Sequence, residues 1–270
     1  MGNITPVIDF STELADLFDL KGRVAYLPGG YGGIGEAIAW GMAIRGAKVV
    51  VSGRSREKAE KLADRIRADG HDALGICVDV HSVAGINASV DQVVREFGPP
   101  DILVNCVGTQ REEPLLEVTE TAFDEVYRSN LKSAMFLAQA VARRQAECGI
   151  KGKHVHLLSV RARLGLRDRG YSAYCSTKGG LVMLIKQHAM ELARLGITVN
   201  GVAPTFVYTE MIQHVMDNPE FKQQLLGRIP LGRIADPKDV VGAVLFFCSP
   251  ASDFITGQIL YVDGGITASQ

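Results

Sequence analysis

Short apolar runs alternate with amphipathic stretches along almost the whole of the 270-residue sequence. The runs lack helical periodicity and predict buried strands, whereas the stretches between them place apolar residues at helical spacing. Alternating strands and helices form right-handed βαβ crossovers, and each crossover returns across a face of the sheet, so the strands are parallel. We therefore predict the α/β fold class, with a single doubly wound parallel seven-stranded sheet, helices on both faces and a Rossmann-type topology.

The predicted organisation is a leader of residues 1–20, followed by one dinucleotide-binding and catalytic domain over residues 21–270. Residues 205–233 have polar helical character without an obvious strand, so we expect a lid over a site. Ligands of doubly wound sheets bind at the carboxyl ends of the strands. The predicted strands are residues 23–27, 48–52, 72–80, 101–108, 154–160, 197–204 and 258–265, and the predicted helices are residues 34–44, 57–68, 84–97, 123–147 and 174–195.

Charge and cysteine content exclude several classes of protein. The net charge of −1 gives no long-range attraction to nucleic acid or to anionic lipid. No apolar run approaches the roughly 20 residues that span a bilayer, so we expect a cytoplasmic protein without membrane or nucleic-acid partners. The five cysteines form no CxxC pair, which argues against disulfides and zinc. His154 and His156 share a face of one predicted strand but lack a third ligand, and no metal is expected.

A glycine pattern follows the first predicted strand. Gly29, Gly33 and Gly35 form GxxxGxG, and Ile34 begins the first predicted helix. Bare backbone can approach a pyrophosphate at the positive end of a helix. Glycine-rich turns also serve tight packing, but the position between a strand and a helix favours dinucleotide binding.

The ends of the third and fourth predicted strands supply candidates for the adenosine half of the cofactor. Asp79 and Val80 end the third strand, where the carboxylate could hydrogen-bond the adenine edge. Asn105 and Gly108 end the fourth strand and could pass under the ribose. Initiation of a turn is an equally good explanation of Asp79.

Arg54 follows the second predicted strand, where a dehydrogenase specific for NAD usually carries an acidic residue. Without a carboxylate to repel a 2′-phosphate, and with a guanidinium able to bind it, the sequence favours NADP over NAD. A solvated arginine at the start of an exposed helix is the alternative. The glycine loop itself offers Tyr31 and no basic side chain.

Tyr174 and Lys178 lie four residues apart, so both side chains project from the same face of a predicted helix. A neighbouring ammonium stabilises a phenolate and lowers the pKa of the tyrosine. Ser159 ends the preceding strand and could hydrogen-bond the same substrate oxygen. Asn130 lies inside a long predicted helix, where an amide is mildly unfavourable, and this local cost suggests a function.

These motifs, together with a C-terminal Val-Asp-Gly-Gly, resemble the short-chain dehydrogenase/reductase family over nearly the whole chain. The resemblance implies hydride transfer between NADP(H) or NAD(H) and a carbonyl or secondary alcohol. It implies Tyr174 as acid/base, Ser159 as orienter of the substrate oxygen, Lys178 as ribose binder that tunes the tyrosine, and Asn130 as holder of a relay water. It also implies a homotetramer with the last strand and the two long helices at its interfaces.

The chain departs from the family pattern at three places, one of which is Asn105-Cys106-Val107-Gly108, where the family usually has Asn-Asn-Ala-Gly. Pro28 replaces the threonine that usually precedes the first loop glycine, so a hydroxyl and a backbone donor are lost. Pro204-Thr205 replaces the usual Pro-Gly after the sixth strand, as in some sugar and polyol reductases of the family. The cofactor contacts implied at the start of the lid come from Pro204, Thr205, Val207 and Thr209.

Arg161, Arg163, Arg167 and Arg169 follow Ser159 within a loop that should flank the substrate. Arginine binds carboxylate or phosphate bidentately, so these residues suggest a sugar acid, keto acid or other anionic hydroxy compound. Together with the resemblance at Pro204-Thr205, they lead us to expect a sugar, polyol or sugar acid, with Ser159, Arg161 and Tyr174 as substrate contacts. Solvation or ion pairing of most of these arginines remains an alternative. Reduction of 3-oxoacyl thioesters or of steroid and other lipid alcohols would keep the same catalytic residues. A cofactor-binding regulator without catalysis is the alternative from another class, and Pro28 favours it.

Overall fold

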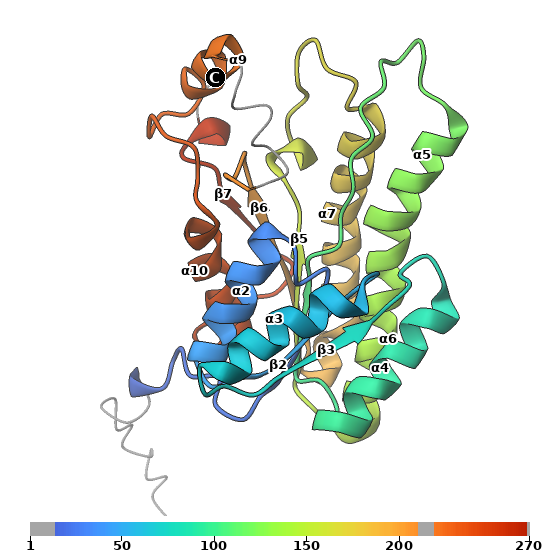
Figure 1. Ribbon diagram of the computed structural model, residues 1–270, viewed down its shortest axis with the longest axis vertical. Helices are drawn as coiled ribbons and strands as arrows, with labels where there is room; N and C mark the ends of the chain where they lie inside the picture. Colours follow the sequence, from blue (N-terminus) through green and yellow to red (C-terminus); the bar gives the residue numbers. More distant parts are fainter. Residues whose placement is uncertain (1–13, 210–218, 269–270) are drawn as a thin grey trace, which may run out of the picture.

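The computed structural model describes residues 14–209 and 219–268, and its strands form one seven-stranded parallel sheet (Figure 1). The strand order is β3-β2-β1-β4-β5-β6-β7, so the direction of winding reverses between β1 and β4. The predicted fold class is confirmed. The strands are β1 (Val24–Pro28), β2 (Lys48–Gly53), β3 (Ala73–Cys77), β4 (Ile102–Asn105), β5 (Lys153–Leu157), β6 (Thr198–Pro204) and β7 (Ile259–Val262).

Helices cover both faces of the sheet. One apolar core lies between the sheet and three helices, and two further cores lie between the sheet and the helices on the other side (Figure 1). The first group is α2 (Gly33–Ile44), α3 (Arg56–Ala68) and α10 (Pro237–Cys248), and the second is α4 (Val83–Phe97), α5 (Glu120–Tyr127), α6 (Ser133–Cys148) and α7 (Ser172–Leu192). The helix α10 is not among those predicted from the sequence.

The central strands are buried on both sides, which favours apolar residues in them, whereas β7 at the edge of the sheet is partly exposed. Every residue of β1 and of β5 is buried. Two histidines of β5 occupy this core with polar partners: His154 Nε2 lies 2.9 Å from Gln145 Oε1, and His156 Nδ1 lies 3.2 Å from Asn105 Nδ2. These bonds reduce the cost of placing imidazoles in an apolar interior.

The helix predicted over residues 123–147 is interrupted by a π-helical turn. The chain runs from α5 through Arg128–Lys132 in π geometry and directly into α6. A π turn accommodates one additional residue and is frequent at functional sites. Asn130 lies within this turn.

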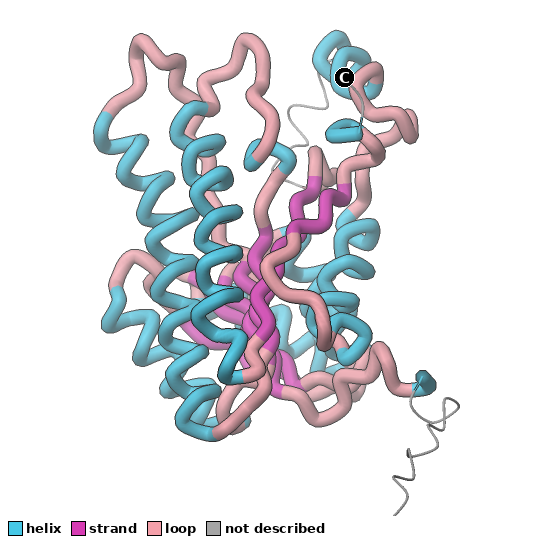
Figure 2. The backbone as a smooth tube through the Cα atoms, turned by 180° about the vertical axis from the view of Figure 1, so that it is seen from behind, coloured by secondary structure: helices cyan, strands magenta, loops and turns pink. Residues whose placement is uncertain are grey.

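The loops after β4 and β5 and the helix α9 (Pro219–Leu226) rise at the same end of the molecule (Figures 1 and 2). That end is the carboxyl end of the strands. Glu113 N donates to Gly170 O at 3.2 Å, and Arg169 forms an ion pair with Glu112, so the two loops are joined. The central part of the predicted lid, residues 210–218, and the leader residues 1–13 lie outside the described residues.

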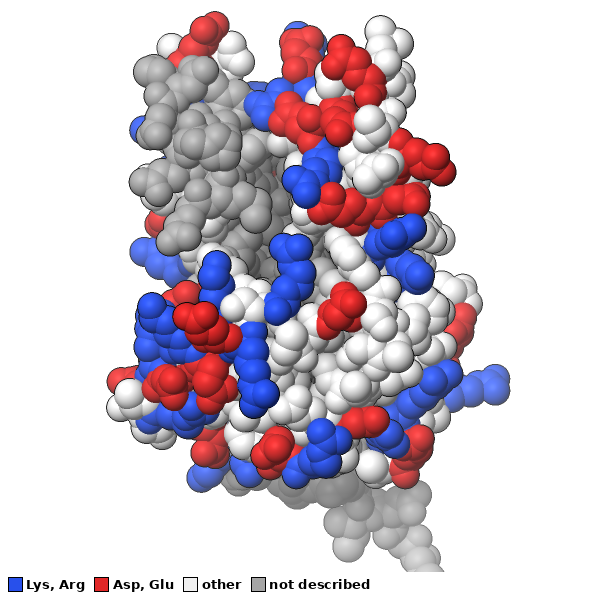
Figure 3. Space-filling view, turned by 45° about the vertical axis from the view of Figure 1, so that its right-hand side comes forward, with Lys and Arg blue, Asp and Glu red and all other residues white. Residues whose placement is uncertain are grey.

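The surface carries no dominant charge on the face that Figure 3 shows. Basic and acidic side chains are interspersed there around a largely uncharged area. Among the described residues, none of the helices combines the length and apolar character needed to cross a membrane.

Candidate active site

The glycine loop between β1 and α2 is packed too closely for side chains. A Cβ on Gly29, where φ is +75°, would lie 2.8 Å from the carbonyl carbon of Cys106. A Cβ on Gly35 would lie 2.7 Å from the Gly29 oxygen, and one on Gly33 would lie 2.5 Å from Thr209 Cγ2. The loop therefore presents bare backbone at the N-terminus of α2, where Ile34 lies in the first turn. Such a helix end attracts phosphate.

Pro28 does not disturb this loop. Its carbonyl accepts a hydrogen bond from Cys106 N at 2.9 Å, and Gly29 N donates to Ser52 O at 2.7 Å. Pro28 ends β1, where its register partner is Ser52. The missing N–H thus falls at the end of the ladder, where a proline is tolerated.

Tyr31 packs against the end of β2, and this contact was not predicted from the sequence. A Cβ on Gly53 would lie 2.4 Å from Tyr31 Cε1, so the ring packs directly over this glycine. The Tyr31 hydroxyl accepts a hydrogen bond from Ser55 N at 3.1 Å. Arg54, between these residues, is exposed and forms no ion pair with another described residue. The position of an aromatic residue between glycines, at Tyr31, is the sequence feature that could have indicated this contact.

The residues that follow β3 and β4 form ordered turns. Asp79 is exposed, and its Oδ1 accepts from His81 N at 3.0 Å, which supports the interpretation of Asp79 as a turn initiator. Val80 follows it and is partly buried. Asn105 is buried, and its Oδ1 accepts from Val107 N at 3.1 Å. Side chains of Asp79 and Asn105 therefore fix the turns that a nucleotide would cross.

Asn130 joins the loop after β4 to α7. Its Oδ1 accepts from Thr109 N at 2.7 Å, and its Nδ2 donates to Thr109 O at 3.0 Å and to Thr177 Oγ1 at 3.2 Å. Both amide protons are thereby used, and one acceptor position of Oδ1 remains. A Cβ on Gly108 would lie 3.5 Å from Lys178 Nζ and 3.7 Å from Asn130 Oδ1, so these three residues meet.

Tyr174, Lys178 and Ser159 lie together at the carboxyl end of β5. Lys178 Nζ is 5.6 Å from the centroid of the Tyr174 ring and donates to Leu157 O at 2.8 Å. The Ser159 side chain accepts from Arg161 N at 3.2 Å and also interacts with the Tyr174 phenol. The structure thus brings together the three side chains predicted from the sequence.

Burial dominates the protonation of this cluster. It raises the pKa of Tyr174 to about 12, opposed by the Ser159 hydroxyl and by the positive charge of Arg161. Burial also lowers the pKa of Lys178 to about 8. The expectation that Lys178 lowers the pKa of Tyr174 below its usual value is wrong for this chain, because desolvation of the phenolate outweighs the neighbouring charges.

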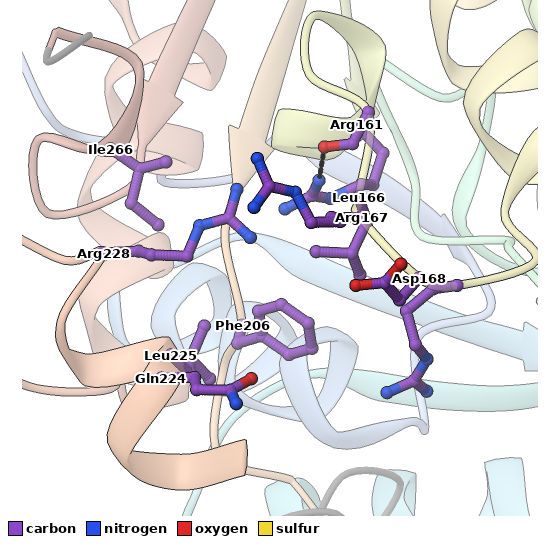
Figure 4. Close-up of a pocket in the computed structure, with 11 residues that line it drawn as sticks. Arg161, Leu166, Arg167, Asp168, Phe206, Gln224, Leu225, Arg228 and Ile266 are labelled. Carbon is purple, nitrogen blue, oxygen red and sulfur yellow. Dashed lines mark hydrogen bonds between the residues drawn. The ribbon is translucent and has the colours of Figure 1, made fainter. Parts of the chain in front are cut away.

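A cavity of about 650 Å³, here called the arginine pocket, opens beside this cluster (Figure 4). Arg161 is buried, and its Nη1 donates to the carbonyl oxygens of Leu164 at 3.3 Å and Gly165 at 2.5 Å. Arg163 is exposed and does not line the pocket. The lining residues are Arg161, Gly165, Leu166, Arg167, Asp168, Arg169, Phe206, Gln224, Leu225, Arg228 and Ile266.

The start of the predicted lid contacts two different regions. Thr209 lies against Gly33 of the glycine loop. Thr205 N donates to Val262 O at 3.2 Å, and its buried Oγ1 has no hydrogen-bond partner within residues 14–209 and 219–268. Thr205 lines a separate cavity of about 220 Å³. Val207 forms an isolated parallel bridge with Ala235 after Pro204 ends β6. Among the described residues, no cluster of three His, Cys, Asp or Glu side chains could hold a metal.

A doubly wound sheet, a bare glycine loop at a helix N-terminus, and adjacent tyrosine, lysine and serine side chains define an NAD(P)-dependent dehydrogenase. Residues 30–267 match the family model described as enoyl-(acyl carrier protein) reductase. The chain belongs to the short-chain dehydrogenase/reductase family.

Curated relatives and solved structures cover nearly the whole chain. Gluconate 5-dehydrogenase of Gluconobacter oxydans is 38% identical over 254 residues, which are 94% of this chain and 98% of that protein. The 5-keto-D-gluconate 5-reductase of Escherichia coli is 35% identical over 93% of this chain and 98% of that protein. The crystal structure of a gluconate 5-dehydrogenase from Burkholderia cenocepacia in complex with NADP and tartrate has a TM-score of 0.91 and 38% identity, covering 95% of this chain and 100% of that chain.

Proposed function

We propose that this protein interconverts a secondary hydroxyl group and a ketone on a sugar acid, with NADP(H) as the hydride carrier. The main support is that the Tyr174 cluster lies next to the arginine pocket. Arg161 connects the two, because it lines the pocket and its positive charge acts on Tyr174. The gluconate-related relatives support a sugar acid.

The residues predicted for the cofactor fit a dinucleotide. Gly29, Gly33, Ile34 and Gly35 provide the closely packed backbone for the pyrophosphate. Arg54 provides a cation for the 2′-phosphate, and the NADP complex of the Burkholderia structure supports this choice. When bound, the cofactor supplies or accepts a hydride at its nicotinamide ring. The remaining proposed contacts are Asp79, Val80, Asn105, Gly108, Tyr174, Lys178, Pro204, Thr205, Val207 and Thr209.

In the direction of reduction, Tyr174 donates its phenolic proton to the substrate oxygen, while Ser159 hydrogen-bonds that oxygen. Its raised pKa keeps Tyr174 protonated at neutral pH, as a proton donor requires. Lys178 binds the ribose and stabilises the phenolate that forms. Asn130 holds a relay water through its remaining acceptor position and fixes the loop at Thr109.

The charged lining of the arginine pocket favours a sugar acid over the alternative substrates. A reductase of acyl thioesters or of lipid alcohols needs an apolar channel, whereas four arginines line this cavity. The assembled Tyr174, Ser159 and Lys178 cluster also speaks against a regulator without catalysis.

We also propose a cytoplasmic homotetramer. Large apolar side chains are exposed on the long helices and near the last strand, as expected of interfaces between copies. Those on the helices are Phe123, Tyr127, Met135, Met183 and Met190, and those near β7 are Phe254 and Leu260.

A panel of substrates tests the proposed activity. The purified protein should oxidise D-gluconate or a related aldonic acid, and reduce the corresponding keto acid, with NADP(H) more efficiently than with NAD(H). Neutral polyols, 3-oxoacyl thioesters and steroids serve as comparison substrates. Higher kcat/KM for a thioester or a steroid than for every sugar acid would refute the proposal.

Replacement of Arg54 by alanine tests the cofactor assignment. The variant should raise KM for NADP about tenfold, because a charge-assisted hydrogen bond contributes about 1.5–3 kcal/mol, and should leave KM for NAD nearly unchanged. Arg56→Ala, an exposed arginine in the first turn of α3, is the matched control. An equal loss with both cofactors would contradict a role at the 2′-phosphate.

A further inference from the structure

The arginine pocket has two walls from distant parts of the chain. The loop after β5 supplies Arg161 and Arg167, and the segment after α9 supplies Arg228. Figure 4 shows the guanidinium of Arg228 pointing into the pocket toward the wall that carries Arg161 and Arg167. Arg161 interacts electrostatically with both Tyr174 and Arg228. The pocket therefore reaches from Arg161, two residues after Ser159, to the α9 segment.

A small apolar cluster holds these walls in place. Leu225, Ile229 and Ile266 form its buried centre, and Leu164 and Phe206 pack against it together with Ile234. Leu164 follows Arg161 by three residues, and Ile229 directly follows Arg228. The cluster thus fixes the two arginines at opposite sides of one cavity.

The described lining has a large excess of positive charge. Four arginines face one carboxylate, that of Asp168. Arg169 is held by Glu112 outside the pocket, and Arg161 is bonded to two carbonyl oxygens. Arg228 has no ion pair with any described carboxylate. Burial lowers the pKa of Arg161, and the positive charge of Arg228 lowers it further, so the two cations repel each other. A bound anion would relieve this repulsion.

We propose that Arg228 and Arg161 together bind the substrate carboxylate, at the end of the molecule remote from the reacting carbon. The inference rests on the proposed function, and it assigns to Arg228 and Arg161 the selection of sugar acids over neutral sugars. Because the charge of Arg161 acts on both Tyr174 and Arg228, a carboxylate bound toward α9 allows a distant hydroxyl to reach Tyr174 and Ser159. The ligand class is a hydroxy monocarboxylate of several carbons, for which a cavity of about 650 Å³ is ample.

The test compares D-gluconate with D-glucitol, a neutral polyol of the same chain length. Arg228→Gln should raise KM for gluconate about 10-fold to 100-fold, as expected for the loss of a charge-assisted contact. It should leave kcat within a few fold and KM for glucitol unchanged. Arg228→Lys should recover part of the affinity, because a point charge replaces a bidentate one. Arg163→Gln, on the same loop as Arg161 but outside the pocket, is the control and should change neither KM.

Direct binding separates this inference from the proposed activity. Calorimetric titration of the NADPH-loaded wild type, in which gluconate cannot be oxidised, should show tighter binding of gluconate than of glucitol, and Arg228→Gln should abolish that difference. Failure of the wild type to turn over every sugar acid while this difference is present would refute the proposed activity and support the subsite. A gluconate affinity that Arg228→Gln leaves unchanged, with an unaltered thermal unfolding midpoint, would overturn the role of Arg228. An equal loss for both ligands would also overturn it.

Discussion

Tyr174→Phe is expected to lower kcat about 1,000-fold, within the usual range for loss of a general acid or base. The phenyl ring keeps the packing of the side chain but has no proton to give to the substrate oxygen. Cofactor affinity, measured by quenching of protein fluorescence with NADPH, should remain within a few fold. Tyr171→Phe is the matched control, because the rings of Tyr171 and Tyr174 pack edge to face with centroids 6.0 Å apart.

The pH dependence of the two directions should differ. With a pKa of about 12, Tyr174 is a phenol at neutral pH, so reduction should be active there. Oxidation needs the phenolate, whose fraction increases with pH, so the oxidation rate should rise from pH 7 to pH 10. An oxidation rate independent of pH, or more than a tenth of wild-type activity in Tyr174→Phe, would show that another group transfers the proton.

Acidification is expected to destabilise the protein by several kcal/mol through its buried histidines. Burial lowers the pKa of His154 to about 3 and lowers that of His156 well below its usual value. Above pH 6.5, near the ordinary pKa of a histidine in the unfolded chain, these imidazoles are neutral in both the folded and the unfolded state, so they cause no loss of stability. Below it, only the unfolded chain takes up protons, so stability falls with pH. His154 alone should cost about 2 kcal/mol between pH 6.5 and pH 5, and His156 adds a loss in the same direction.

Urea unfolding at a series of pH values measures this effect. His154→Gln should flatten the acid limb of stability against pH, because one buried titrating group is removed, although the variant is less stable at pH 7. His71→Gln, at a partly exposed histidine beside Asp69, is the matched substitution outside the core of the sheet. If His154→Gln and the wild type lose stability in parallel below pH 6.5, the imidazole of His154 is not responsible.

The sheet and its functional ends follow from local sequence patterns. The short apolar run at β1, which ends at a Pro-Gly-Gly turn, predicts a buried strand, and every residue of β1 is buried. Tyr174 and Lys178 are one helical turn apart, and Ser159 directly follows the carboxyl end of β5, so their meeting depends only on short-range geometry and the βαβ rule. The glycine pattern is informative for the same reason.

Other features depend on contacts between distant segments and escaped prediction. Arg228 reaches the arginine pocket only because Ile229 packs in an apolar cluster with Ile266, about 40 residues along the chain. The pKa of Tyr174 depends on how far the surrounding structure excludes water from its hydroxyl group. The spacing of Tyr174 and Lys178 in the sequence gives no information on that burial. The side chain of Asn130 signalled a function, but the π geometry around it could not be predicted from one amide.

The π-helical turn at Arg128–Lys132 also limits how the length of this chain can change. Each residue of an α-helix turns the chain by about 100°. The wider turn takes up one residue more, which lets α5 and α6 each keep their own apolar side toward their neighbours while Asn130 faces Thr109. Removal of one residue here would leave a regular helix but would rotate one half against the other. A shortened chain could therefore keep every motif and still misplace the helix that holds Asn130.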